Sequence, residues 1–498
     1  MEAIKKLAGQ TVIYGMGTIV PRFLNYLLLT PFYTRLFEKG EYGIVTELYA
    51  YVALLLVILT YGMETTSFRF AETERNSRKV FSTAMVSILA SSTFFILLIG
   101  LLHEQIAGWM RYESNSEYII WMAIIVASDA FMAIPFARLR QQNKAVRFSA
   151  IKFIGISVNI GLNLLFLVYM PNLSEKGSDS FLLRFYNPEI GVGYAFIANL
   201  IAVGVTFLLL IRDIIEIKFD FSKQLLKKML TYAWPLIIIG VAGMINEVAD
   251  KPLMKYLLKI PSGVSDENGY VMEQIGVYGA NTKIAVLMTI FIQMFKFAAE
   301  PFFFNQAKEK NSNQVYADVM KYFVVFCMLI FLGVTLFIDV VKYFIDEKFH
   351  EGLNVVPIIL IGNMFLGVFY NLSVWYKLKD LTRLGAVIAI IGASITLLIN
   401  FIFVPNYGYM GSAWGHLACY TVMMTISYLW GRRYLAVNYD LKRILTYMAI
   451  GFAIYVISLF NLLDTTWAFY LVNCVLFLLF AGIVFIAERG KLKQVFVG

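Results

Sequence analysis

Charged side chains interrupt strongly apolar segments of this 498-residue chain. In the stretch FKFAAEPFFFNQA (295–307), Lys296 and Glu300 stand four residues apart and share one face of a helix. Thr289 and Gln293 extend the same face, which gives a polar stripe over three helical turns. The spacing predicts either an intrahelical ion pair that closes one end of a helix, or a set of groups that faces a polar cavity.

A second charged stretch is NEVADK (246–251). Asn246 and Asp250 share one helical face, and Glu247 and Lys251 share the adjacent face. Two carboxylates this close either belong to a self-neutralising helical segment or repel each other and share a proton, which would suit proton coupling. The sequence leaves both interpretations open.

Single ionisable residues also occur within apolar segments, namely Arg22, Glu64, Asp129 and Lys283. An ionised group at the centre of a bilayer costs about 2.5–3.5 kcal/mol on insertion scales, so it usually faces a cavity or a partner. Arg22 follows Pro21 near the middle of its segment, beyond comfortable snorkelling reach. We interpret Arg22 as a cavity residue, with pairing to a carboxylate such as Asp129 as the structural alternative.

The composition is that of an integral membrane protein. Hydrophobic residues make up 59% of the chain and charged residues 15%, and the mean hydropathy is +0.70, whereas globular proteins carry about 25% charged residues. The three cysteines and three histidines are scattered, so neither a metal site nor a disulfide framework is indicated. We expect no cofactor.

Apolar runs of about 20 residues predict fourteen transmembrane helices. Basic residues then divide unevenly between the two sides, with 29 in the termini and alternate connections, 10 in the other connections and three within spans. Because cytoplasmic loops are rich in Lys and Arg, both termini are predicted to be cytoplasmic. The predicted spans are 9–34, 42–68, 80–102, 117–138, 149–170, 190–211, 229–257, 276–304, 317–345, 353–376, 384–404, 409–431, 444–462 and 466–487.

The chain contains an internal repeat. EYG (41–43) and VYG (277–279) open corresponding spans, and Glu64 and Glu300 each follow 21 residues after the glycine. An even number of spans per copy keeps both copies in the same orientation, so the repeat axis runs along the membrane normal. We therefore expect an all-α membrane protein with two pseudo-symmetric six-helix lobes, 1–216 and 217–436, and a terminal helix pair, 437–498.

Duplicated lobes that rock against each other are typical of alternating-access transport. The chain has neither a GxxxxGK[ST] phosphate loop nor a GxSxG or HExxH motif, and its longest predicted outside loops, 171–189 and 259–274, are too short for a catalytic domain. The sequence therefore favours transport over enzymatic activity. Energy for uphill movement would come from exchange or from an ion gradient, with H+ or Na+ as the candidate coupling ion. The basic net charge follows from topology and attraction to lipid, and indicates no nucleic-acid partner.

Several long stretches resemble a known family. LTPFYTRLFEKGEYGIVTELYAYVALLLVILTYGMETTSFRF (29–70), GMINEVADKPLMKYLL (243–258) and IGVYGANTKIAVLMTIFIQMFKFAAEPFFFNQA (275–307) resemble the polysaccharide-transporter branch of the multidrug/oligosaccharidyl-lipid/polysaccharide exporter superfamily, especially Wzx-type flippases. The resemblance implies movement of an undecaprenyl-pyrophosphate-linked oligosaccharide across the bacterial inner membrane. It also implies membrane lipids as contacts, and a polysaccharide polymerase and glycosyltransferases as candidate partners.

A pyrophosphate needs cations that offset its desolvation. The candidates are Arg22, Lys251, Lys283 and Lys296, and the polar cavity or ion-coupling candidates are Glu64, Asp129, Asn246, Glu247, Asp250, Gln293 and Glu300. A lipid II flippase or a drug/ion antiporter of the same superfamily, and a membrane polymerase or ligase, are the alternatives.

The internal repeat indicates different roles for Lys296 and Glu300. Glu300 has a counterpart in Glu64, so the acid belongs to a position used in both lobes. Lys296 corresponds to Thr60, which makes the lysine the better candidate for contact with substrate.

Overall fold

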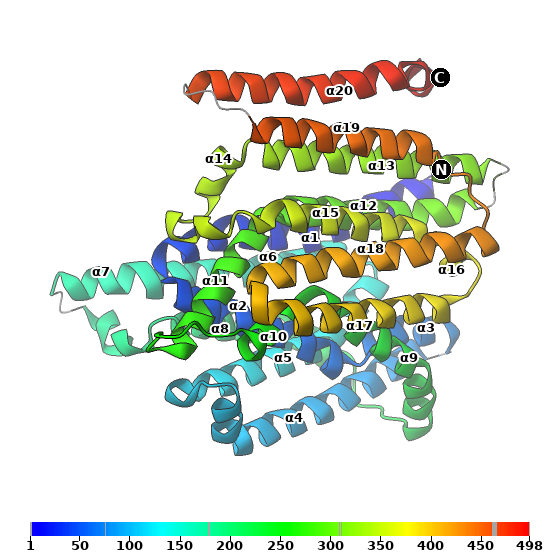
Figure 1. Cartoon of the computed structure of the whole chain (residues 1–498). Helices are drawn as coiled ribbons and strands as arrows, with labels where there is room; N and C mark the ends of the chain where they lie inside the picture. The colour runs from blue at the N-terminus through cyan, green and yellow to red at the C-terminus, as the bar shows by residue number, and fades with distance from the viewer. Residues whose placement is uncertain are drawn as a thin grey trace. The chain divides into compact units, whose positions relative to one another are not determined.

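The computed structural model describes the backbone of residues 2–74, 76–177, 180–307, 309, 311–460 and 466–497. Within these ranges, the side chains of 2–16, 18, 22, 73, 301, 305, 466 and 490–497 are not described. The described part of the chain consists of helices and their connections, with no β-strand (Figure 1). This confirms the expected all-α architecture.

Twenty α-helices account for most of the residues that the structure describes. The first ten are α1 (Glu2–Leu36), α2 (Lys39–Thr60), α3 (Met63–Thr73), α4 (Ser77–Trp109), α5 (Glu117–Gln141), α6 (Ala145–Leu164), α7 (Met170–Glu175), α8 (Gly193–Ile215), α9 (Lys223–Val248) and α10 (Asp250–Leu257). The others are α11 (Glu267–Ile284), α12 (Val286–Gln306), α13 (Ser312–Thr335), α14 (Ile338–Val341), α15 (Val355–Leu372), α16 (Val374–Leu378), α17 (Thr382–Tyr407), α18 (Tyr409–Tyr434), α19 (Leu441–Leu459) and α20 (Thr466–Val497). Short 3-10 turns are η1 (Glu113–Asn115), η3 (Phe181–Phe185), η4 (Pro188–Ile190), η5 (Lys342–Phe344) and η6 (Glu347–Gly352), and a π-helical turn, η2 (Leu165–Tyr169), links α6 to α7.

Within the described residues, 12 helical segments are long and apolar enough to cross a membrane. They coincide with twelve of the fourteen predicted spans. The remaining two predicted spans, the first and the twelfth, fall on α1 and α18, which are helices of 35 and 26 residues. The chain is thus a multi-pass membrane protein, and the count of fourteen stays a prediction.

Several prolines lie within helices, and a helix break occurs at a glycine instead. Pro21, Pro235 and Pro301 lie inside continuous helices, whereas Tyr61 and Gly62 adopt left-handed φ angles of 31° and 69° between α2 and α3. Gly62 tolerates this conformation because it has no Cβ. Two further breaks separate α9 from α10 and α11 from α12. The predicted outside loop 259–274 also ends in helix, because α11 begins at Glu267.

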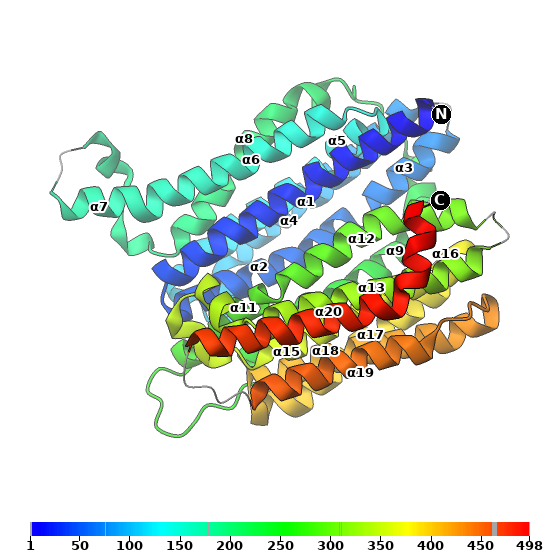
Figure 2. The ribbon, with the colours of Figure 1, turned by 90° about the horizontal axis from the view of Figure 1, so that it is seen from above.

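The chain forms two compact units. Unit 1 comprises Met1–Gly279 and Asn400–Tyr409, and unit 2 comprises Ala280–Ile399 and Met410–Gly498. In unit 1, α6 packs along α1 and α8, α5 packs on α4 and α8, and α9 packs on α2 and α3 (Figure 2). The lobe boundaries 1–216, 217–436 and 437–498 stay a prediction.

Glycines bring two helices of unit 1 into backbone contact. A Cβ on Gly43 of α2 would overlap the carbonyl oxygen of Met272 in α11, and a Cβ on Gly276 would overlap that of Lys39. A Cβ on Gly279 would in turn lie 2.6 Å from the side chain of Thr46. The glycines of the repeated EYG and VYG motifs therefore occur where α2 and α11 pack too closely for a larger side chain.

In unit 2, the terminal helices α19 and α20 lie alongside α13 (Figures 1 and 2). Their attachment centres on the buried carboxylate of Glu488, which pairs with Lys321 of α13. Arg443 and Tyr447 of α19 also donate to this carboxylate at 3.2 and 2.8 Å, and Tyr322 donates at 3.1 Å. The Glu488 carboxylate thus joins α13, α19 and α20. A charged group in a membrane protein that is shielded from water needs such partners.

A second buried ion pair joins helices of unit 1. Lys255 of α10 lies 2.8 Å from Glu47 of α2, and both side chains have 0% exposure. Tyr112, between α4 and α5, donates to the same carboxylate at 2.5 Å, and the Lys255 ammonium lies 3.8 Å from the centroid of its ring. Burial, together with the neighbouring Glu47 carboxylate, raises the pKa of the Tyr112 phenol, which keeps it a hydrogen-bond donor.

Lys255→Met should destabilise unit 1 by about 3–5 kcal/mol, because it leaves Glu47 buried without its cation. The double variant Glu47→Leu/Lys255→Met should recover most of that loss, since no buried charge then remains. Thermal unfolding of the purified protein in detergent measures both effects. Lys259→Met is the matched control, because Lys259 is exposed at the same end of the unit; equal destabilisation by both single variants would contradict the assignment.

Candidate functional site

A hollow in unit 2 collects several charged and polar side chains. We call it the α12 hollow; its polar lining is Lys296, Glu300, Tyr370, Ser373 and Lys377, from α12 and from the segment that runs from α15 to α16. Its empty volume is about 330 Å³, part of which is open to the surroundings. It is the place in unit 2 where the predicted stripe residues Lys296 and Glu300 meet groups from another helix.

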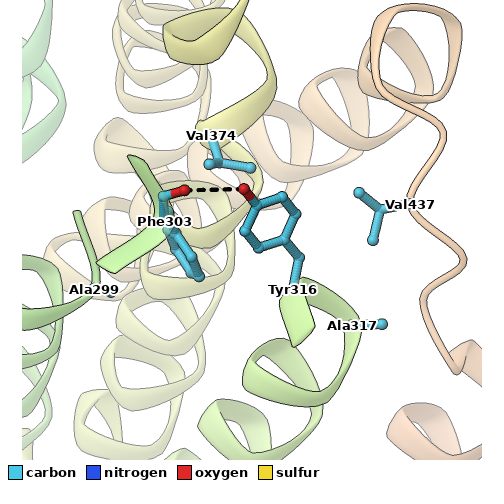
Figure 3. Close-up of a cluster of buried hydrophobic side chains, with 6 residues drawn as sticks. All are labelled: Ala299, Phe303, Tyr316, Ala317, Val374 and Val437. Carbon is cyan, nitrogen blue, oxygen red and sulfur yellow. Dashed lines mark hydrogen bonds between the residues drawn. The ribbon is translucent and has the colours of Figure 1, made fainter. Parts of the chain in front are cut away.

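The base of the hollow is a packed hydrophobic cluster. Figure 3 shows the Tyr316 ring between Phe303 and Val437, with its hydroxyl directed at the Phe303 backbone. This hydroxyl donates to the Phe303 carbonyl at 2.9 Å. Phe303 and Val374 belong both to the cluster and to the hollow lining, so α12 and α16 hold the polar groups on a fixed support.

The ion pair in the hollow differs from the predicted alternative of an intrahelical pair. Glu300 accepts from Lys377 of α16 at 2.9 Å, and the Lys296 ammonium lies 4.5 Å from the centroid of the Tyr370 ring. Lys296 and Glu300 do lie four residues apart on α12. Glu300 nevertheless pairs with Lys377 of α16, so the ion pair joins two helices. Gln293 lies on the same helix and is half-buried.

Unit 1 contains a matching ion pair. Arg140, near the end of α5, pairs with Glu64 of α3, and its guanidinium lies 5.0 Å from the centroid of the Phe68 ring. The two pairs have almost the same sequence separation, 76 residues for Glu64 and Arg140 and 77 for Glu300 and Lys377. This spacing supports the sequence repeat and assigns both acids a structural role at corresponding positions.

The NEVADK stretch forms a self-neutralising cluster. Asp250 interacts with Lys251 at 2.9 Å and accepts from Tyr278 of α11 at 2.7 Å. Asn246 is buried, whereas Glu247 is exposed. The two carboxylates therefore have different surroundings, which agrees with the first of the two interpretations of this stretch.

The other predicted residues are dispersed. The side chain of Arg22 lies outside the described residues. Asp129 is half-buried in α5 and interacts electrostatically with Lys152 of α6, while Lys283 is half-buried in α11. Among the described residues, no group of three or more His, Cys, Asp or Glu is placed to hold a metal ion.

Sequence reasoning missed several charged residues that the structure places in contacts between helices, among them Glu47, Lys255, Lys321, Lys377 and Glu488. Lys377 comes directly after the predicted span 353–376, and Lys255 lies at the end of the predicted span 229–257, so both were counted with the connections. The contact of Lys377 could not be found from local spacing, because its partner Glu300 is 77 residues away. Glu47 lies within a span and was overlooked, although an acid there needs a partner.

The fold and its buried charges define a class: an all-helical, multi-pass membrane protein. Over 96% of this chain and 100% of the other, the structure is similar to a lipid II flippase, MurJ, in an inward closed conformation, with a TM-score of 0.73 and 16% identity. An inward-facing multidrug resistance MATE family transporter of the MOP superfamily matches with a TM-score of 0.63 and 15% identity, covering 86% and 97% of the two chains. A MATE in the straight conformation matches with a TM-score of 0.57 and 16% identity, covering 86% of this chain and 95% of the other.

No protein-family model and no curated protein sequence matches the chain. At 13–16% identity the similar structures establish the fold alone. The expected all-helical membrane fold is confirmed, and membership of the superfamily and of its polysaccharide-transporter branch stays a prediction.

Reversing the ion pair of the hollow tests its structural role. The double variant Glu300→Lys/Lys377→Glu should change the unfolding free energy by less than about 1 kcal/mol, because both side chains are partly exposed and attraction is kept. Glu300→Lys alone should lower thermal stability, because it gathers three cations in one hollow. The matched pair of variants in unit 1 is Glu64→Lys with and without Arg140→Glu. If the reversed pairs are no more stable than the single variants, the pairs are not structural.

Proposed function

We propose that this protein is a flippase that moves undecaprenyl-pyrophosphate-linked oligosaccharides across the bacterial inner membrane for the biosynthesis of surface polysaccharide. The single observation that carries the proposal is the similarity to a lipid II flippase along 96% of this chain and the whole of that chain. The MATE structures cover 86% of this chain. The proposal therefore places the protein among flippases of large lipid-linked molecules.

The chemistry of the helices supports an anionic cargo. A lipid-linked pyrophosphate must lose part of its hydration as it crosses, and cations inside the protein offset that loss. Arg22, Lys251, Lys283 and Lys296 are the proposed cations, and polar groups would contact the sugars while the polyprenyl chain stays in lipid. In this scheme both termini are cytoplasmic and the lobes 1–216 and 217–436 alternate in exposing the cargo.

Lipid II is the second candidate cargo, because the similar flippase is named for it. It has the same polyprenyl pyrophosphate anchor, so the intramembrane cations do not separate the two candidates. A multidrug antiporter, suggested by the MATE structures, is the weaker candidate. Two lysines and one glutamate line the α12 hollow, and their net positive charge would repel a cationic drug.

Transport by the purified protein distinguishes these cargoes. Proteoliposomes would be loaded with undecaprenyl-pyrophosphate oligosaccharide, lipid II or a cationic dye, each fluorescent, and an impermeant quencher would report the fraction that reaches the outer leaflet. We expect the oligosaccharide lipid to cross at least tenfold faster than in protein-free vesicles, and faster than lipid II. Equal rates with and without protein for every lipid cargo would refute the proposal.

Arg22→Ala should abolish transport of the lipid-linked oligosaccharide while leaving the protein level in the membrane unchanged. The reason is that the guanidinium is the proposed counter-charge of the pyrophosphate in α1. Arg212→Ala is the matched control, because the Arg212 side chain is 78% exposed at the end of α8. Normal transport by Arg22→Ala would remove Arg22 from the cargo site.

A further inference from the structure

The α12 hollow is complementary to an amphiphile that carries one negative charge. Two lysines and one glutamate line it, which leaves a net charge of +1. Its walls include Phe295, Phe303 and Phe304, and Phe304 is 45% exposed. The hollow therefore presents cations for a phosphate group and, beside them, aromatic side chains for a hydrocarbon chain.

The repeat shows which part of the hollow is not required by the fold. Glu300 and Lys377 correspond to Glu64 and Arg140. With the registers that align these two pairs, 236 and 237 residues, Lys296 corresponds to Thr60 and Tyr370 corresponds to Ala133.

Unit 1 therefore has the same ion pair without the lysine and the tyrosine beside it. Thr60 donates its hydroxyl to the Leu56 carbonyl of its own helix at 2.7 Å. The fold is thus built in unit 1 with no cation at this position, and Lys296 on Tyr370 is an addition specific to unit 2.

The location of the hollow suits a lipid headgroup. The positive-inside distribution places the Lys377 end of its helix, and the C-terminal half of α12, toward the cytoplasm. Basic pockets between transmembrane helices on this side bind phosphates of anionic lipids. The Lys296 ammonium lies 4.5 Å from the centroid of the Tyr370 ring and lines the hollow, so its positive charge is available to attract an anion there.

From these contacts, we propose that the α12 hollow binds the phosphate of an anionic lipid of the inner leaflet, with Lys296 and Lys377 as its cations and the phenylalanine wall against its hydrocarbon. Two sources share this chemistry: a polyprenyl pyrophosphate, and an ordinary anionic phospholipid. The first would deepen the proposed function and rests on it, as a loading site for the cargo, whereas the second would be independent of the cargo.

Binding of defined lipids to the full chain in zwitterionic detergent tests the proposal. The probes are undecaprenyl pyrophosphate, phosphatidylglycerol and phosphatidylcholine, titrated into the labelled protein and followed by thermophoresis. We expect both anionic probes to bind more tightly than phosphatidylcholine, and Lys296→Gln to weaken binding of the anionic probe at least fivefold with no change in melting temperature.

Two further variants make the test specific. Lys379→Gln removes a lysine from the same helix end; Lys379 is exposed and does not line the hollow, so binding should stay within twofold of the wild type. Glu300→Gln should tighten binding at least threefold, because it raises the net charge of the hollow from +1 to +2 and releases Lys377 from its carboxylate.

The outcomes separate the site from the cargo. Preference for undecaprenyl pyrophosphate that is lost in Lys296→Gln supports a loading site for the cargo. Equal, Lys296-dependent binding of undecaprenyl pyrophosphate and phosphatidylglycerol supports the phosphate site even if proteoliposome transport of the oligosaccharide lipid fails. Wild-type affinity in Lys296→Gln, an equal loss in Lys379→Gln, or no preference for anions over phosphatidylcholine would each overturn the proposal.

Discussion

The cost of placing an ionised side chain in hydrocarbon controls most of the described structure. Away from water, a charge is tolerated when the protein supplies its counter-charge and hydrogen bonds. The pairs of Glu47 with Lys255 and of Glu488 with Lys321 satisfy this condition with almost no exposure. Each also joins helices that are distant in sequence, so the same requirement that neutralises a charge determines which helices must meet.

The partly exposed pairs have a different role. Glu64 with Arg140, and Glu300 with Lys377, lie at corresponding positions of the two units and keep partial contact with the surroundings. Pairs of this kind contribute little to stability, but they orient helix ends and leave room for added groups. Lys296 and Tyr370 beside one of them illustrate how a duplicated unit can acquire a new property while its supporting contacts stay unchanged.

The sequence predicted the elements that depend on composition and periodicity. The spans followed from apolar length, whereas the break at Gly62 inside the predicted span 42–68 is a feature that the structure adds. The helices continue through Pro21 and Pro235, as membrane helices often do when neighbouring groups satisfy the backbone. Glu64 and Glu300, which the repeat aligns, each pair with a basic residue 76 or 77 residues further along the chain.

Side-chain partners were harder to predict. A spacing of four residues favours a contact between Lys296 and Glu300, but it carries no information on Lys377, which approaches from another helix. The same limit applies to Lys255, whose partner Glu47 is 208 residues away. Local spacing predicts which residues share a face, whereas the choice among partners depends on how the helices pack.

The buried ion pair of Glu488 with Lys321 has a consequence for biogenesis. Lys321 and Glu488 are 167 residues apart, which a ribosome that adds about 5–20 residues per second covers in about 10–30 s. During this interval α13 is in place before its buried counter-charge has been synthesised. Asp318, 3.6 Å from Lys321 and one turn earlier on the same helix, is a carboxylate that the nascent chain already carries. The last helix to emerge therefore completes the neutralisation of a helix synthesised long before it, and the order of synthesis becomes part of how unit 2 matures.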